Sequence, residues 1–231
     1  MRPSWCLLLP LSLGCACLAT PPRPPLEMAE QGRLSRSLEN QTRFLRISFF
    51  VTPFFGDESK QLLSPTHPDW LHLLEDTDGN PVSPGDVEAV LPAGTLVRIL
   101  KVEFPSTWAL QERVLYSPRS RPWVYVTTQH ASKPLILVLN NNFKDTKDFL
   151  AELNRYVTPL NPSIFMAELS VDEQSAIRTK EALVGMGAEA LEMALGYPES
   201  KTILFEGEQK TETWVWGGGK KTVTLRAGRV Q

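Results

Sequence analysis

The last third of the chain, residues 170–231, begins with two segments that follow the helical period. Ser170 and Glu173 have the spacing of a capping box, in which each side chain bonds the amide of the other residue at a helix N-terminus. A second segment ends at Gly196 and Pro198, which are typical of a helix C-terminus. Its apolar face, at positions i, i+3 and i+4, consists of Leu191, Ala194 and Leu195.

Beyond these helices the pattern changes to the alternation of β-strands. A strand is expected at residues 202–205, and Trp214 and Trp216 alternate so that both indoles lie on one face of the next strand. Glycines at 217–219 indicate a turn before a last long strand. The inner face of that strand is expected to consist of Val223 and Leu225. Two short helices packed on a three-stranded antiparallel meander would bury one apolar layer, so the pattern predicts an α+β fold of ααβββ type.

Four short motifs occur along these elements, namely Gly185-Met186, Leu195-Gly196-Tyr197-Pro198, Trp214-Val215-Trp216 and Gly228-Arg229-Val230. Their order resembles the SmpA/OmlA (BamE-like) family of outer-membrane lipoproteins. Gly187 departs from the pattern, since the family usually has Thr or Ser there as an N-cap. The resemblance implies an outer-membrane location and a non-enzymatic structural or assembly role. It does not imply membership of the barrel-assembly complex, because this chain has a further domain that small family members lack.

The middle of the chain, residues 44–157, is rich in β-branched and aromatic residues. Strands are expected at 44–52, 96–104, 123–127 and 135–139, with a long polar loop at 56–86. Several short strands separated by turns predict a small barrel. The turn at 91–95 resembles that of bacterial SH3-like modules, so an SH3-like domain is expected here.

A helix capped by Asn142 is predicted over residues 143–157, at the end of this SH3-like domain. Its apolar stripe is expected to pack on the barrel. Pro159 and Pro162 then mark the boundary to a C-terminal BamE-like domain at residues 163–231.

The first 19 residues have the features of a secretory signal peptide, because a short apolar run follows Arg2. All three cysteines fall within the first 17 residues, at Cys6, Cys15 and Cys17. Lipoprotein processing needs a cysteine after small residues, and Cys15 is favoured over Cys17 because Gly14 directly precedes it. Ordinary secretion, with cleavage after residue 19, is the alternative. Residues 20–43 are expected to form a proline-rich and polar tether.

Few residues along the chain suggest chemistry. The net charge of −2 gives no electrostatic footprint for nucleic acid. The segment Asp76–Asn80 resembles the start of a calcium loop, but Pro81 and Val87 occupy two positions that define such a loop, so a turn is expected. No catalytic, phosphate-binding or dinucleotide motif is present. We therefore predict no enzymatic activity, cofactor or metal, and assign the basic segment 119–121 to a solvated loop or a contact with lipid headgroups.

Two classes of function remain. The first is an envelope lipoprotein that faces the periplasm from the outer membrane, or a secreted protein, and acts by binding other envelope proteins. The second is a peptidoglycan-associated binding protein led by the SH3-like module. Trp214 and Trp216 are the candidate binding surface if their face is exposed. If that face meets the helices, both are core residues whose N–H groups should have partners.

Overall fold

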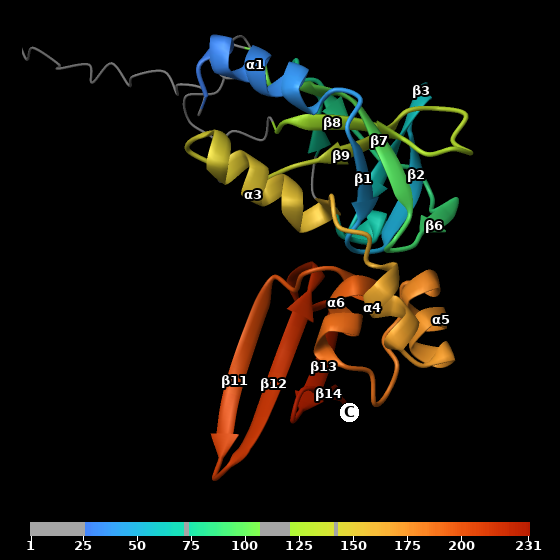
Figure 1. Ribbon diagram of the computed structural model, residues 1–231, viewed down its shortest axis with the longest axis vertical. Coiled ribbons are helices and arrows are strands. Elements are labelled where there is room, and N and C mark those ends of the chain that lie inside the picture. The colour runs from blue at the N-terminus through green and yellow to red at the C-terminus, as the bar shows by residue number, and fades with distance from the viewer. Residues whose placement is uncertain (1–25, 72–73, 107–120, 141–142) are drawn as a thin grey trace, which may run out of the picture.

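The computed structural model describes residues 26–71, 74–106, 121–140 and 143–231. Its helices and strands form two lobes, one above the other in Figure 1. We call residues 26–158 the N-terminal lobe and residues 163–231 the C-terminal lobe. Within the described ranges, no helix is both long and apolar enough to cross a membrane.

A mixed eight-stranded sheet forms the framework of the N-terminal lobe. Its order is β10-β1-β7-β8-β9-β3-β2-β6, and all neighbours are antiparallel except β3 and β9. The strands are β1 (Thr42–Leu45), β2 (Phe49–Phe54), β3 (Asp57–Ser64), β6 (Ala89–Leu91), β7 (Leu96–Glu103), β8 (Trp123–Thr127), β9 (Leu135–Val138) and β10 (Val157–Thr158). Beside this sheet lie η1 (Pro68–Trp70) and a small ribbon of β4 (Leu74–Glu75) and β5 (Pro81–Val82).

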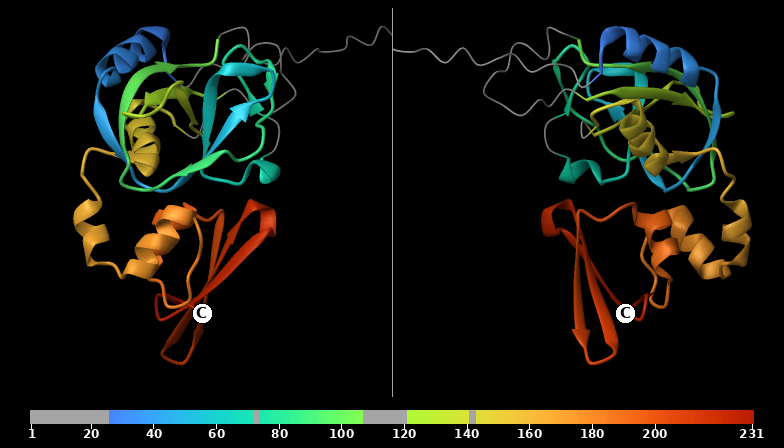
Figure 2. Two further views of the ribbon diagram at one scale, coloured as in Figure 1. Left: turned by 90° about the vertical axis from the view of Figure 1, so that its right-hand side faces the viewer. Right: turned by 60° about the vertical axis from the view of Figure 1, so that its left-hand side comes forward.

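Both faces of the large sheet carry apolar side chains, and alternate residues of one strand belong to different cores. In β9, Leu135 and Leu137 join the larger core while Ile136 joins a smaller one. The larger core is completed by α1 (Met28–Leu38) and α3 (Thr146–Tyr156), which contribute Leu34 and Phe149, among others. The sheet curls, and these two helices lie along one side of it (Figures 1 and 2).

This architecture corrects the prediction of a small SH3-like barrel at residues 44–157. The predicted strand 44–52 is two strands, β1 and β2, and the predicted loop 56–86 contains β3. The first five residues of β3 are partly or fully exposed and the last three are buried, so the strand has no regular alternation. Because its buried end faces a core on each side of the sheet, the pattern did not indicate a strand. The predicted strands at 96–104, 123–127 and 135–139 correspond to β7, β8 and β9.

The C-terminal lobe combines three helices with a four-stranded antiparallel sheet. The sheet order is β11-β12-β13-β14. The elements are α4 (Ser163–Glu168), α5 (Val171–Thr179), α6 (Ala188–Leu195), β11 (Ser200–Glu206), β12 (Gln209–Trp216), η2 (Gly217–Gly219), β13 (Lys221–Arg226) and β14 (Arg229–Val230).

The predicted α+β fold with an ααβββ module is therefore wrong, since the chain is mostly β with helices. The structure adds α4 before the first predicted helix and β14 after the last predicted long strand. The helix α4 has only six residues, which is too short for a helical period to be recognised in its sequence. The two-residue strand β14 is shorter than the alternation that signals a strand.

The capping box predicted at Ser170 is confirmed. The hydroxyl of Ser170 accepts from the amide of Glu173, and the Glu173 carboxylate accepts from the amide of Ser170. The same carboxylate also accepts from the amide of Gly187, over 3.2 Å, at the start of α6. Burial acts to raise the pKa of Glu173, but these hydrogen bonds outweigh it and hold the pKa below its ordinary value. Glu173 thus caps α5 and contacts the N-cap of α6, which has no capping side chain.

Candidate functional site

The two lobes are joined through Ser48, which lies between β1 and β2 and is completely buried. Its hydroxyl donates to the carbonyl of Ile177 over 2.6 Å and accepts from the amide of Ala93. Its own amide donates to the carbonyl of Met193 over 2.7 Å. One small residue of the N-terminal lobe therefore bonds both α5 and α6, which fixes the relative position of the lobes.

Lys180 forms the second connection between the lobes. It ends α5 in the left-handed conformation, with φ of 61°, and its side chain is buried. Its ammonium donates to three carbonyls, those of Ser48 at 2.8 Å and of Ala194 and Leu195 at 3.2 Å. Burial lowers the pKa of Lys180 to about 7, and repulsion by Lys221 acts in the same direction. The ammonium thus has a carbonyl for each of its three protons, two of them at the C-terminal end of α6.

A glycine turn of the C-terminal lobe packs directly on a tryptophan of the N-terminal lobe. Gly217 has a φ of 59°, and a Cβ atom there would lie only 2.5 Å from the ring of Trp70. The amides of Gly217 and Gly218 donate to the carboxylate of Glu199, over 3.0 and 2.8 Å. Glycine is therefore required at 217 both for its backbone conformation and for the close approach of the indole.

Beside this turn lies a pocket of about 300 Å³ between the lobes. We call it the lysine–aromatic pocket. Residues that line it include Phe50, His67, Trp70, Trp216, Lys220 and Lys221. The centroids of the Phe50 and His67 rings are 5.3 Å apart in an edge-on arrangement, and those of His67 and Trp70 are 5.9 Å apart. Aromatic side chains and cations thus face the same small volume.

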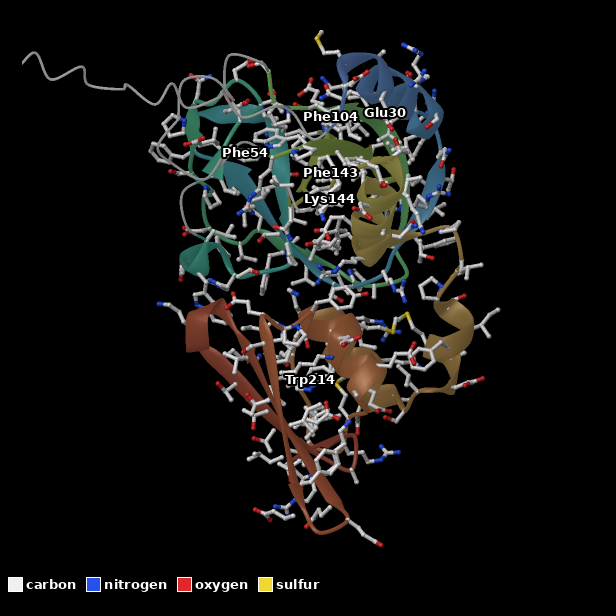
Figure 3. All side chains as sticks on the ribbon, turned by 90° about the vertical axis from the view of Figure 1, so that its left-hand side faces the viewer. Glu30, Phe54, Phe104, Phe143, Lys144 and Trp214 are labelled. Carbon is white, nitrogen blue, oxygen red and sulfur yellow. The ribbon has the colours of Figure 1, made fainter. Side chains whose placement is uncertain are left out.

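Trp214 and Trp216, the candidate surface from the sequence, are both buried, with 2% and 6% of their surface exposed. The indole N–H of Trp214 donates to Glu212 and that of Trp216 to the carbonyl of Gly196. The Lys201 ammonium lies 3.6 Å from the centre of the Trp214 ring. Figure 3 shows Trp214 inside the C-terminal lobe. Both indoles therefore occupy the core, which is the second of the two alternatives left open by the sequence.

A run of three exposed apolar residues lies instead on β11, the edge strand of the C-terminal sheet. All seven residues of β11 are exposed, and Ile203, Leu204 and Phe205 expose 46%, 59% and 69% of their surface. Only β12 pairs with β11 among the described residues, so the outer edge of the strand has free main-chain groups. The hairpin of β11 and β12 points away from the N-terminal lobe (Figures 1 and 2).

Ile203 and Phe205 are exposed because the helices do not extend far enough to cover them. Ile203 lies opposite Glu212 on β12, and Lys201 lies opposite Trp214, so Ile203 and Phe205 share the face of the sheet on which Trp214 is buried. The eight residues of α6 span about 12 Å and the seven of β11 about 23 Å. Leu204 points to the opposite face. The tip of the hairpin is thus apolar on both faces.

The remaining sequence candidates are not brought together at one site. Cys15 and Cys17 lie outside the described residues, as do Asn142 and Arg119. Arg121 is exposed and lines a second pocket of about 360 Å³, to which Arg155 also contributes.

The segment that resembles the start of a calcium loop forms a turn. The Asp76 carboxylate accepts from the amides of Asp78 and Asn80. Within the described ranges, no cluster of His, Cys, Asp or Glu is arranged to hold a metal ion.

The sequence predicted the strand β11 but did not indicate that its apolar side chains are exposed. The only signal was the position of the three apolar residues next to a two-residue turn, which places them at a hairpin tip. The lysine–aromatic pocket could not be predicted, because Phe50 and Lys221 are far apart in sequence and meet only when the lobes pack.

No family model, curated protein or solved structure matches this chain.

Proposed function

We propose that this chain is a non-enzymatic, lipid-anchored protein of the cell envelope that binds an extended segment of another envelope protein along β11. The observation that carries the proposal is the edge strand itself: seven consecutive exposed residues, three of them large and apolar. An edge strand of this kind binds an extended peptide through main-chain hydrogen bonds, and alternate side chains provide specificity. Proteins normally protect such an edge, since it otherwise promotes aggregation.

The chemistry of the partner follows from the face on which each side chain lies. Ile203 and Phe205 would contact apolar side chains at alternate positions of the added strand, and Leu204 would contact one on the opposite face. Lys201 and Glu206 stand at the two ends of the apolar segment. The expected partner is therefore a short extended segment with an apolar centre.

The anchor and the envelope location rest on the sequence, namely the signal peptide and the cysteines Cys15 and Cys17. Two of the motifs on which the resemblance to the SmpA/OmlA family rests are in contact with each other. The amide of Gly185 donates to the carbonyl of Val230, and the amide of Val230 to that of Met186. Main-chain hydrogen bonds thus join the first motif to the last. The alternative function, peptidoglycan binding, depended on an SH3-like barrel. The N-terminal lobe has an eight-stranded mixed sheet in place of that barrel.

Position-specific photocrosslinking in intact cells tests the proposal. A photoreactive phenylalanine analogue at position 205 should crosslink to one extended segment of another envelope protein, identified by mass spectrometry. The same analogue at the exposed position 222 of β13 is the control and should give no such product. The change Ile203→Asp should abolish the crosslink from position 205.

Two results would contradict the proposal. One is equal crosslinking from positions 205 and 222. The other is a product that contains only two copies of this chain, since β11 would then pair with itself rather than with a partner.

A further inference from the structure

The lysine–aromatic pocket has the composition of a ligand site that is separate from β11. Its volume of about 300 Å³ is at the lower end of the range for small-molecule sites. Residues of both lobes line it, among them Phe50 and Trp70 from one lobe and Trp216 and Lys221 from the other. The bonds of Ser48 and Lys180 hold the lobes together, so the walls of the pocket are preformed.

The walls favour a planar apolar group. His67 and Trp70 are only partly buried, and their ring centroids are 5.9 Å apart. The Phe50 ring meets His67 edge-on and carries the Lys180 ammonium 5.1 Å from its centre. Aromatic rings pair with another ring in offset-stacked or edge-on arrangements, which contribute more than the area that they bury.

The rim favours an anion. Lys220 is exposed, Lys221 is partly buried, and neither forms an ion pair with a described residue. Burial lowers the pKa of Lys221, and the nearby Glu181 carboxylate opposes this effect. Lys180 is already bonded to three carbonyls. The ammonium groups of Lys220 and Lys221 at the rim therefore provide positive charge that a ligand can neutralise.

We propose that the lysine–aromatic pocket binds a small organic monoanion that carries both a planar aromatic ring and a carboxylate. The ring packs against Trp70 and His67, and the carboxylate lies between Lys220 and Lys221. Two sources have this chemistry, a free aromatic acid and the C-terminal aromatic residue of a peptide. The site is independent of the β11 edge, because no residue of β11 lines the pocket.

Isothermal titration of the full chain with N-acetylphenylalanine tests this proposal. We expect saturable binding with a dissociation constant of about 1 mM or lower, as for a weak ligand of this size. Two probes serve as controls. The carboxamide of N-acetylphenylalanine has the ring without the charge, and acetate has the charge without the ring. Both should bind at least about tenfold more weakly.

Charge variants locate the site. Lys221→Gln should weaken binding of N-acetylphenylalanine about tenfold, because it removes the partly buried ammonium. Lys147→Gln makes the same change on the exposed side of α3, away from the pocket, and should leave the affinity unchanged. A tripeptide that ends in phenylalanine distinguishes the two sources, since tighter binding of the tripeptide points to a peptide C-terminus and weaker binding to a free acid.

Equal affinities for the acid and its carboxamide would overturn the proposal. The absence of saturation at a ligand concentration ten times the expected dissociation constant would overturn it as well. The proposal would also be overturned if Lys221→Gln and Lys147→Gln changed the affinity for N-acetylphenylalanine equally. None of these outcomes depends on the crosslinking from β11, so the two proposals can fail separately.

Discussion

The ammonium of Lys180, in the C-terminal lobe, donates a hydrogen bond to the main-chain carbonyl of Ser48, in the N-terminal lobe, over 2.8 Å. The same ammonium bonds two carbonyls at the end of α6. One buried cation with no carboxylate partner among the described residues therefore connects three segments of the chain. Stability of the whole molecule should depend on this side chain.

The first prediction concerns removal of this cation. Lys180→Met keeps most of the apolar length of the side chain but leaves three carbonyls without their donor. We expect a loss of about 2–4 kcal/mol in the free energy of unfolding, because unpaired buried acceptors are costly. Urea unfolding at pH 6, where Lys180 keeps its proton in the folded chain, measures this loss. Lys220→Met, at an exposed position, is the matched control and should change stability by less than about 0.5 kcal/mol. Equal effects of the two changes would show that the Lys180 hydrogen bonds do not stabilise the fold.

The second prediction is a pH dependence of stability. In the unfolded chain, Lys180 keeps its proton up to its ordinary pKa of 10.5, whereas the folded chain releases it above about 7. Between these values the unfolded state binds more protons, so the folded state becomes more stable as the pH rises. The contribution of Lys180 deprotonation to the free energy of unfolding is complete above pH 10.5 and is lost as the pH falls towards 7.

Urea unfolding between pH 7 and 9 checks this second prediction, because few tyrosines of the unfolded chain ionise below pH 9. The expected rise is at most roughly 1.4 kcal/mol per pH unit for one group. Lys180→Met should reduce this rise to the part that comes from Lys221, whose pKa burial also lowers. Parallel pH curves for the two proteins would contradict the assignment to Lys180.

The third prediction uses two neighbouring glycines as a matched pair. Gly217 and Gly218 both have left-handed φ angles, 59° and 64°, and both donate to Glu199. Only at Gly217 would a Cβ atom collide with Trp70. Gly217→Ala should therefore cost about 1–3 kcal/mol more than Gly218→Ala in thermal unfolding. In a Trp70→Ala background this difference should disappear, and its persistence would mean that Trp70 does not contact the turn in solution.

The fourth prediction concerns the anchor. A palmitate analogue should label the chain in a bacterial host, because lipoprotein processing attaches acyl chains to a cysteine. Cys15→Ser should abolish the label, and Cys17→Ser should leave it in place. Absence of label on the unchanged chain, or label that survives when both cysteines are replaced, would contradict lipid anchoring.

Local patterns predicted about half of the individual elements, and they missed α1, which lies in the predicted tether at residues 20–43. Trp123–Thr127 was predicted as a strand with the bounds that β8 has, and the Ser170 capping box was found from two residues. Such features depend on neighbours in sequence, so the sequence alone is sufficient to predict them. The predicted cap Asn142 lies outside the described residues, and Asp145 is the N-cap of α3 in the structure.

The arrangement of the elements could not be predicted in the same way. The parallel pairing of β3 with β9 joins segments separated by some 70 residues, and no local pattern indicates it. Packing of the C-terminal lobe against the N-terminal lobe depends on Ser48 and Lys180, whose residue types alone suggest an exposed loop. The burial of Trp214 and Trp216, and the exposure of Ile203 and Phe205, depend on where α6 ends.

The fifth prediction tests the central claim most directly, that the edge of β11 binds an extended segment of a partner. Once crosslinking from position 205 has identified that segment, it can be added as a synthetic peptide and amide hydrogen exchange measured with and without it. We predict slower exchange in residues 200–206 and no change in α3, because new main-chain hydrogen bonds form only at the β11 edge. Unchanged exchange in residues 200–206, with protection elsewhere, would contradict the claim.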